Sequence, residues 1–282
     1  MTTTTHSLPL PDTGQTTGQT AELTVEQTGS GRPFLLLHGG AGPASVLPFA
    51  QLLAAEQPAR VLVPTHPGFG GTPRPAQVAD VRALAALYLA LLDELDLEGV
   101  TVVGNSIGGW VAAEIAALGS PRVSGVVIVN GVGFDDPAHP VADFFALSLD
   151  QLTDLSYDDP DRFRLDPATL GERQKALMGA NRQAIAVYGG ATMTDPTLAA
   201  RLAGVSVPTL VLWGQSDGIA GPEYGRAYAA AIPTARYQPL ERTGHLPQVE
   251  SPAATLAAMW EFAQQQWTES TEQPWTESTD HH

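Results

Sequence analysis

The segment V-T-V-V-G-N-S-I-G-G at residues 100–109 constrains the fold of this chain more than any other stretch. Residues 100–104 carry strand-forming side chains, and from Ile107 onward the apolar residues recur at helical spacing, so a strand must turn sharply into a helix. Ser106 lies on that turn, flanked by Gly104 and Gly108, where a tight angle leaves no room for a Cβ atom. Such a turn lifts the Ser106 hydroxyl clear of the sheet, at a helix N-terminus whose dipole favours negative charge.

Strands and helices alternate on both sides of this turn. The predicted strands cover residues 21–27, 33–37, 60–63, 100–104, 125–130, 207–214 and 235–240, and the predicted helices cover residues 44–57, 80–96, 107–118, 222–232 and 253–264. This alternation predicts an α/β fold with a doubly wound, mostly parallel sheet, whose ligands bind beyond the carboxyl ends of the strands. Ser106 follows such an end.

The alternation stops between residues 131 and 205, where the sequence predicts short helices over 142–153, 167–188 and 196–202 and no strand. We therefore expect a core domain of residues 21–130 and 206–265 with a helical insertion over 131–205. Residues 1–20, rich in Thr, Gly, Pro and Gln, predict a flexible N-terminal segment. Residues 266–282, in which W-T-E-S-T occurs twice, predict a disordered acidic tail.

Charge and composition argue against several classes of function. The chain of 282 residues carries 14 Lys and Arg against 30 Asp and Glu, a formal charge of −16. Binding to nucleic acid relies on basic side chains, so neither nucleic acid nor a membrane surface is an expected partner. The absence of Cys excludes thiol nucleophiles, disulfides and zinc–thiolate sites. The start lacks a signal-like pattern and no apolar run is long enough to span a membrane, so we expect a cytoplasmic protein.

Three further motifs follow predicted strands. They are H-G-G at residues 38–40, Q-S-D at 215–217 and G-H-L-P-Q-V-E-S-P at 244–252. Together with G-N-S-I-G at 104–108, they resemble the oxyanion loop, acid turn, base loop and nucleophile elbow of the α/β-hydrolase family. The resemblance extends over residues 21–265 and implies an α/β-hydrolase sheet whose helical insertion forms a cap over the active site.

The resemblance also implies a Ser-His-Asp triad. Ser106 would be the nucleophile, His245 its base, and Asp217 the acid that orients His245. Asn130 occupies the usual rival position for the acid, but it carries no negative charge. Glu250 is expected to brace the loop of His245 rather than to take part in the chemistry.

Two backbone N–H groups would form the oxyanion hole. By position in the family pattern they belong to Gly40, with Ala41 as an alternative, and to Ile107. His38 precedes this loop and is expected to be structural, and His66 is expected to be a surface or loop-bracing residue.

Four residues are candidates for substrate binding. Phe144 and Phe145 are among the aromatic residues with which the cap could line an apolar pocket, and Arg182 could meet a substrate carboxylate. Asn105 stands beside the nucleophile.

The expected function is a carboxylesterase-like serine hydrolase acting on a small or medium carboxylic ester through an acyl-enzyme. One alternative is carbon–carbon bond hydrolysis of vinylogous diketone acids, because G-N-S-x-G-G resembles the elbow of that subfamily, although Leu246 stands where it often has Trp. The other is a ligand-binding receptor or a non-hydrolytic enzyme on the same scaffold. No metal or organic cofactor is implied, the expected partner is a small-molecule substrate, and a homodimer is left open.

Overall fold

The computed structural model describes residues 1–10 and 18–272, with an eight-stranded sheet at the centre of the molecule. The strand order is β1-β2-β4-β3-β5-β6-β9-β10. β2 pairs antiparallel with β1 and with β4, and the other neighbours are parallel. The strands are β1 (Thr2–Pro9), β2 (Thr20–Gly29), β3 (Arg32–Leu37), β4 (Ala59–Pro64), β5 (Val100–Asn105), β6 (Val123–Val129), β9 (Thr209–Gly214) and β10 (Ala235–Leu240).

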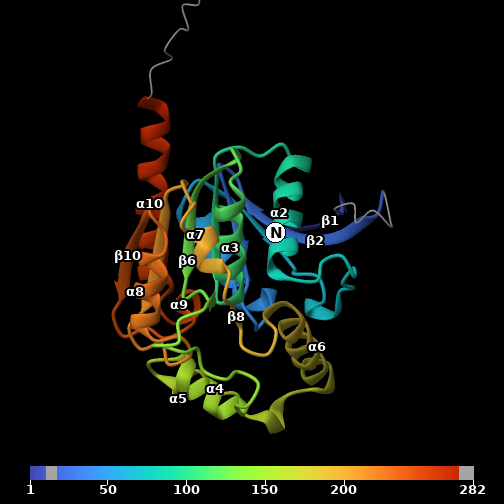
Figure 1. The fold of residues 1–282 in the computed structure, drawn as a ribbon. Helices are drawn as coiled ribbons and strands as arrows, with labels where there is room; N and C mark the ends of the chain where they lie inside the picture. The colour runs from blue at the N-terminus through green and yellow to red at the C-terminus, as the bar shows by residue number, and fades with distance from the viewer. Residues whose placement is uncertain (11–17, 273–282) are drawn as a thin grey trace, which may run out of the picture.

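Helices cover both faces of the sheet (Figure 1). One face carries α2 (Val81–Glu94), α3 (Ile107–Leu118) and α8 (Pro222–Ala230), and the other carries α1 (Leu47–Glu56) and α10 (Pro252–Glu272). Successive strand residues point to opposite faces, so Val102 packs in the first apolar cluster and Val103 in the second. The predicted α/β class with a doubly wound, mostly parallel sheet is therefore confirmed.

Most of the helical insertion lies beyond the carboxyl ends of the parallel strands. α4 (Leu149–Ser156), α5 (Pro160–Phe163) and α6 (Glu172–Gly189) lie together at one end of the molecule, whereas α7 (Leu198–Leu202) packs beside α3 (Figure 1). The short elements are η1 (Pro43–Ser45), η2 (Phe69–Gly71), η3 (Pro167–Thr169), β7 (Gly133–Phe134), β8 (Thr194–Asp195) and α9 (Pro247–Glu250). Tyr188 of α6 donates from its hydroxyl to the carbonyl of Pro67, 2.8 Å away, which joins the insertion to the core.

The N-terminal segment corrects one expectation. Residues 1–20 were expected to be flexible, but Thr2–Pro9 forms β1 and pairs in continuous register with residues 20–27 of β2. Threonine is a β-branched residue that favours extended backbone, and Leu8 is completely buried in the core. Residues 11–17 of this predicted segment lie outside the described part of the chain.

The C-terminal helix corrects a second boundary. Residues 266–272, predicted to belong to a disordered tail, continue α10 without a break. Trp267 is 8% exposed and packs against Phe34 and Trp260, with the guanidinium of Arg32 4.9 Å from its ring centroid. The packing of Trp267 stabilises the helix beyond residue 264, where the regular spacing of apolar residues ends. The rest of the predicted tail, residues 273–282, lies outside the described residues.

The insertion also differs in detail from the prediction. Residues 142–148 are not helical, and α4 begins at Leu149 because Ser148 and Gln151 form a reciprocal capping box. β7 and β8 pair in parallel, although no strand was predicted here. Strands of two residues are too short to carry a periodic signal.

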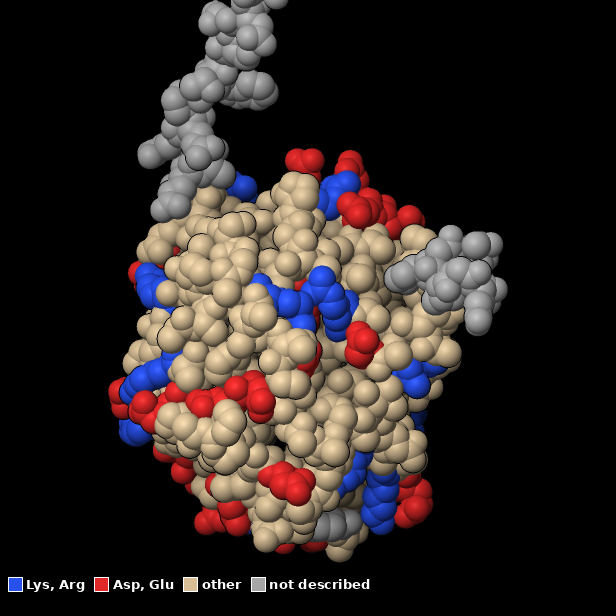
Figure 2. Space-filling model, in the orientation of Figure 1, with Lys and Arg blue, Asp and Glu red and all other residues tan. Residues whose placement is uncertain are grey.

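Within the described residues, no helix is both long and apolar enough to cross a membrane. On the face of the molecule shown in Figure 2, most of the surface belongs to uncharged residues. The Lys and Arg side chains lie in small groups.

Candidate active site

Ser106 lies on the predicted turn between β5 and α3. Its backbone has φ 57° and ψ −119°, a conformation that residues other than glycine rarely adopt. A Cβ atom at Gly104 would lie 2.0 Å from the carbonyl oxygen of Gly108, and one at Gly108 would lie 2.4 Å from that of Leu37. Both positions therefore require glycine, as the sequence predicted.

The structure brings Ser106, His245 and Asp217 together in one hydrogen-bonded chain. Nε2 of His245 lies 2.9 Å from the Ser106 hydroxyl oxygen, and Nδ1 lies 2.8 Å from Oδ2 of Asp217. Because an ionised carboxylate only accepts, Nδ1 carries the proton and leaves Nε2 free to accept from Ser106. His245 and Asp217 are buried, whereas Ser106 is partly exposed.

Asp217 is held by three further donors. Asn130 donates from Nδ2 to Oδ2 over 2.6 Å, and the backbone N–H groups of Ile219 and Ala220 donate to Oδ1 over 2.8 and 3.0 Å. Asn130 is itself oriented by the N–H of Gly214, which donates to its Oδ1. Sequence reasoning rejected Asn130 as the acid but missed that it binds the acid. Its place at the end of β6, beside β9, is the signal that could have suggested this.

The loop of His245 is bound by the insertion. The N–H of His245 donates to the carbonyl of Ser156 over 2.7 Å, and the N–H of Gly218, next to Asp217, donates to that of Leu155 over 2.8 Å. The last turn of α4 therefore contacts both the acid turn and the base loop. Sequence reasoning did not find these contacts, because they use backbone groups.

Glu250 braces this loop, as predicted. Oε2 accepts from the N–H of Gly244 over 2.6 Å, and Oε1 accepts from the N–H groups of Asp158 and Asp159 over 2.8 and 3.1 Å. One carboxylate thus joins the base loop to the segment after α4.

Asn105 does not have the predicted substrate-binding role. Its Nδ2 donates to the carbonyls of His245 and Val129 over 2.9 and 3.2 Å, and its Oδ1 accepts from Gln248 over 3.1 Å. The residue is 4% exposed, and protein partners engage both ends of the amide. Asn105 therefore holds the base loop beside the elbow instead of facing a ligand.

The other three predicted substrate residues form a cluster in the insertion. The guanidinium of Arg182 lies 5.2 Å from the ring centroid of Phe144 and 5.5 Å from that of Phe145, and it donates to the Phe145 carbonyl over 2.6 Å. Phe144 also lines a cavity of about 330 Å³ with Phe134, Met193 and Tyr224. None of Ser106, His245 and Asp217 lines this cavity.

The predicted oxyanion loop lies under α6. A Cβ atom at Gly40 would lie 2.7 Å from Cδ1 of Ile185, and the exposed Ala41 accepts through its carbonyl from Asn181 over 3.3 Å. Ile107 is the first residue of α3, where a backbone N–H has no partner within the helix. Ile107 therefore places a backbone N–H next to Ser106.

His38 and His66 are completely buried behind this loop, which excludes a surface position for His66 and agrees with a bracing role. Burial lowers the pKa of His38 to about 4 and that of His66 well below its usual value, so both rings are neutral near pH 7. No group of three or more His, Cys, Asp or Glu in the described residues is arranged to hold a metal ion.

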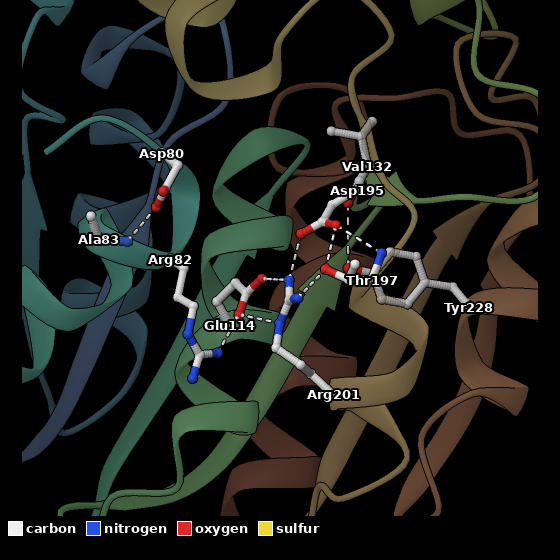
Figure 3. Close-up of polar contacts among 9 residues, drawn as sticks. All are labelled: Asp80, Arg82, Ala83, Glu114, Val132, Asp195, Thr197, Arg201 and Tyr228. Carbon is white, nitrogen blue, oxygen red and sulfur yellow. Dashed lines mark hydrogen bonds and ion pairs between the residues drawn. The ribbon is translucent and has the colours of Figure 1, made fainter.

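A second charged cluster lies on the flank of α3, distinct from the residues bonded to Ser106 (Figure 3). Glu114, 1% exposed, is paired with Arg201 of α7 and with Arg82 of α2, the latter over 3.1 Å. Arg201 also pairs with Asp195 of β8 over 2.6 Å. This cluster ties the last elements of the insertion to the helix that begins after Ser106.

Comparison with known proteins points to one family. The sequence pattern that defines the alpha/beta hydrolase family matches residues 34–258. The chain is 29% identical over 233 residues to the dihydrolipoyllysine-residue acetyltransferase component of the acetoin cleaving system of Pseudomonas putida, which covers 78% of this chain and 60% of that protein. It is 27% identical over 238 residues to Lipase 1 of Psychrobacter immobilis, covering 79% of this chain and 74% of that protein.

A solved structure shares the fold over nearly the whole length. A thermophilic esterase from Thermogutta terrifontis, with malate bound, superimposes with a TM-score of 0.73 at 25% identity. The match covers 93% of this chain and 99% of the esterase chain.

Proposed function

This chain belongs to the alpha/beta hydrolase family, and on that premise we propose that it is a serine hydrolase that cleaves small or medium carboxylic esters. The observation that carries the proposal is the position of His245 between Ser106 and Asp217, with both ring nitrogens within 2.9 Å of their partners. That arrangement is the one nucleophilic acyl transfer requires.

In the proposed reaction, Ser106 attacks the ester carbonyl carbon while Nε2 of His245 takes the hydroxyl proton. The imidazolium then gives this proton to the leaving alkoxide, and the ester carbon–oxygen bond breaks. Asp217 stabilises the imidazolium, and the three donors around its carboxylate hold it in place beside His245. Water, activated by the same imidazole, releases the carboxylic acid from Ser106.

The N–H groups of Gly40 and Ile107 would stabilise the oxyanion of the tetrahedral intermediate. Each donor of this kind lowers the barrier by about 3 kcal/mol in a dry site. The cover that Ile185 gives to Gly40 supports a site that excludes water and accepts an apolar acyl or alcohol group. The lipase and the esterase among the compared proteins support an ester substrate.

A fluorophosphonate probe tests the proposal directly. The native chain should be labelled covalently at Ser106 and should hydrolyse a series of aryl esters of increasing acyl length. The Ser106→Ala variant should do neither while keeping the same circular dichroism spectrum. A folded native chain that neither reacts with the probe nor hydrolyses any ester would refute the assignment.

A second candidate reaction is hydrolysis of a carbon–carbon bond in a vinylogous diketone acid. Arg182 is half-buried, and none of the ion pairs among the described residues involves it, so it could bind a substrate carboxylate. Relative turnover of an aryl ester and a dienol-diketone acid decides between the two reactions, and Arg182→Met should weaken only the second. The cytoplasmic location and the homodimer stay predictions.

A further inference from the structure

Two buried imidazole rings lie behind the oxyanion loop and take no part in the proposed reaction. The rings of His38 and His66 are 3.8 Å apart between centroids, and both side chains are 0% exposed. Phe69 meets both rings edge-on, at 4.9 and 5.6 Å between centroids. Burying two polar rings is costly unless their nitrogens are hydrogen-bonded, so their partners indicate their purpose.

Every ring nitrogen has a partner, and the partners determine both tautomers. Nδ1 of His38 lies 2.8 Å from the carbonyl of Gly39 and must donate, so Nε2 is the acceptor of the N–H of His66 at 3.0 Å. Nε2 of His66 lies 2.8 Å from the carbonyl of His38 and must also donate, so its Nδ1 accepts from the hydroxyl of Tyr88. The result is a chain from Tyr88 through His66 and His38 to Gly39.

The end of this chain sets the orientation of one peptide group. The carbonyl of Gly39 accepts from His38 Nδ1 and also from the N–H of Gly42 over 3.0 Å. The Gly39 carbonyl and the Gly40 N–H belong to the same planar trans amide, so they point in opposite directions. Holding the carbonyl toward His38 therefore turns the Gly40 N–H away from it. A Cβ atom at Gly39 would lie only 3.1 Å from Cβ of Ser106, so this amide lies against the nucleophile.

We propose that Tyr88, His66 and His38 are positioning residues, which fix the Gly39–Gly40 amide so that the Gly40 N–H faces the oxyanion formed at Ser106. The proposal rests on the proposed function, because it assigns these residues to the oxyanion hole of that reaction. Their neutral state is part of the arrangement, since a protonated ring would lose the nitrogen that accepts. Burial, which lowers the pKa of both rings, keeps that acceptor available.

Paired substitutions at His38 test which of its contacts matters. The side-chain NH₂ of Asn can replace the Nδ1–H donor, whereas Gln places its amide near the position of Nε2. His38→Gln should lower kcat for an aryl ester about 100-fold with little change in KM, because a misaligned donor acts on the transition state. His38→Asn keeps the donor to Gly39 but loses the acceptor for the N–H of His66, so its kcat should fall only about fivefold. Equal losses in both variants, or no loss in His38→Gln, would overturn the proposal.

An alkyl boronic acid separates positioning from a general loss of stability. It forms a tetrahedral adduct with Ser106 whose oxygen occupies the oxyanion position. Its Ki should therefore rise in His38→Gln by about the same factor as kcat falls.

Tyr88→Phe should lower kcat about fivefold, as loss of one neutral hydrogen bond predicts. Tyr228→Phe removes another fully buried hydroxyl, bonded to the Val132 carbonyl over 3.3 Å, and should leave kcat unchanged. Variants that only melt earlier, with kcat and Ki unchanged, would contradict the proposal.

The native chain provides a test that does not depend on any variant. Long-range proton–nitrogen NMR correlations near neutral pH should show His38 protonated only at Nδ1 and His66 only at Nε2. A charged ring or the reverse tautomers would contradict the proposal.

Fluorophosphonate labelling distinguishes failure of the positioning role from failure of the proposed function. If native Ser106 does not react, the proposed function is wrong. If it reacts and turns over esters while His38→Gln keeps its kcat and Ki, only the positioning role is wrong.

Discussion

At the scale of single residues, the candidate site depends on side chains that orient other side chains. Asp217 accepts four hydrogen bonds, from His245, Asn130 and two backbone N–H groups. Asn105 donates to the backbone carbonyl of His245 over 2.9 Å. The resemblance to the α/β-hydrolase family implied the residues that would react, whereas Asn105, expected beside the substrate, bonds to the backbone of His245. Amides bond equally well to ligand and to backbone, so their type alone does not indicate their role.

Asn130→Asp tests how far the acid depends on its neighbour. The substitution keeps the size and the acceptor for the Gly214 N–H, but it replaces the donor to Asp217 by a second carboxylate that repels the first. We expect kcat/KM for an aryl ester to fall about tenfold or more near neutral pH. Kinetics with circular dichroism as a folding control check this, and unchanged kinetics in a folded variant would contradict it.

Gly108→Ala tests the steric basis of the elbow. Its Cβ would lie 2.4 Å from the Leu37 carbonyl, a contact that only backbone movement can relieve. We expect the free energy of unfolding to fall by about 3 kcal/mol or more, measured by denaturant titration. Gly179→Ala is the matched control, since a Cβ there meets nothing within 4 Å and the residue lies within α6. That variant should be neutral or more stable by about 0.5–1 kcal/mol.

At the scale of elements, the long periodic segments were predicted well and the irregular ones were not. The helix predicted over 80–96 is α2 (Val81–Glu94), which begins where the side chain of Asp80 accepts from the N–H of Ala83. By contrast, β1 and the last two turns of α10 depend on partners far away in sequence, β2 for the former and Phe34 for Trp267. Local patterns carry no information about such partners.

Arg201→Met tests the attachment of α7 to α3. Among the described residues, the substitution leaves Glu114, 1% exposed, with Arg82 as its one remaining cationic partner, and Arg82 is itself 47% exposed. A buried carboxylate that loses its main partner should lower the free energy of unfolding by about 3 kcal/mol. Lys175→Met removes an exposed ion pair with Glu172 on α6 and should change the free energy of unfolding by less than about 1 kcal/mol. Equal effects in the two denaturant titrations would mean that the Glu114 cluster does not stabilise the fold.

At the scale of the whole molecule, the insertion and the core form the site jointly. α4 bonds to the loops that carry Asp217 and His245, and α6 covers the loop of Gly40 and bonds to it through Asn181. The loops that carry Ser106, Asp217, His245 and Gly40 all follow parallel strands, so the sheet brings them to one edge.

The buried histidines predict how stability depends on pH. The folded pKa of His38, about 4, lies below its ordinary value of 6.5, so the unfolded chain binds the extra proton between these values. The free energy of unfolding should therefore be highest above pH 6.5 and fall as the pH drops toward 4, by about 3 kcal/mol for His38 alone. His66 adds to the loss in the same direction. Denaturant titrations across this range should show a shallower pH dependence in His38→Asn, and identical dependences would contradict the assignment.

The sequence by itself determined the α/β class and the strand–turn–helix at Ser106, because these depend on apolar period and on the small size of glycine. Its resemblance to the α/β-hydrolase family implied the three residues that the proposed reaction would use. Only the tertiary structure decided that Nε2 of His245 meets a hydroxyl 139 residues away, that Asn105 holds the base loop, and that Tyr88, His66 and His38 form one chain. Contacts between distant segments arise from how the sheet and its helices pack, and no short stretch of sequence records that packing.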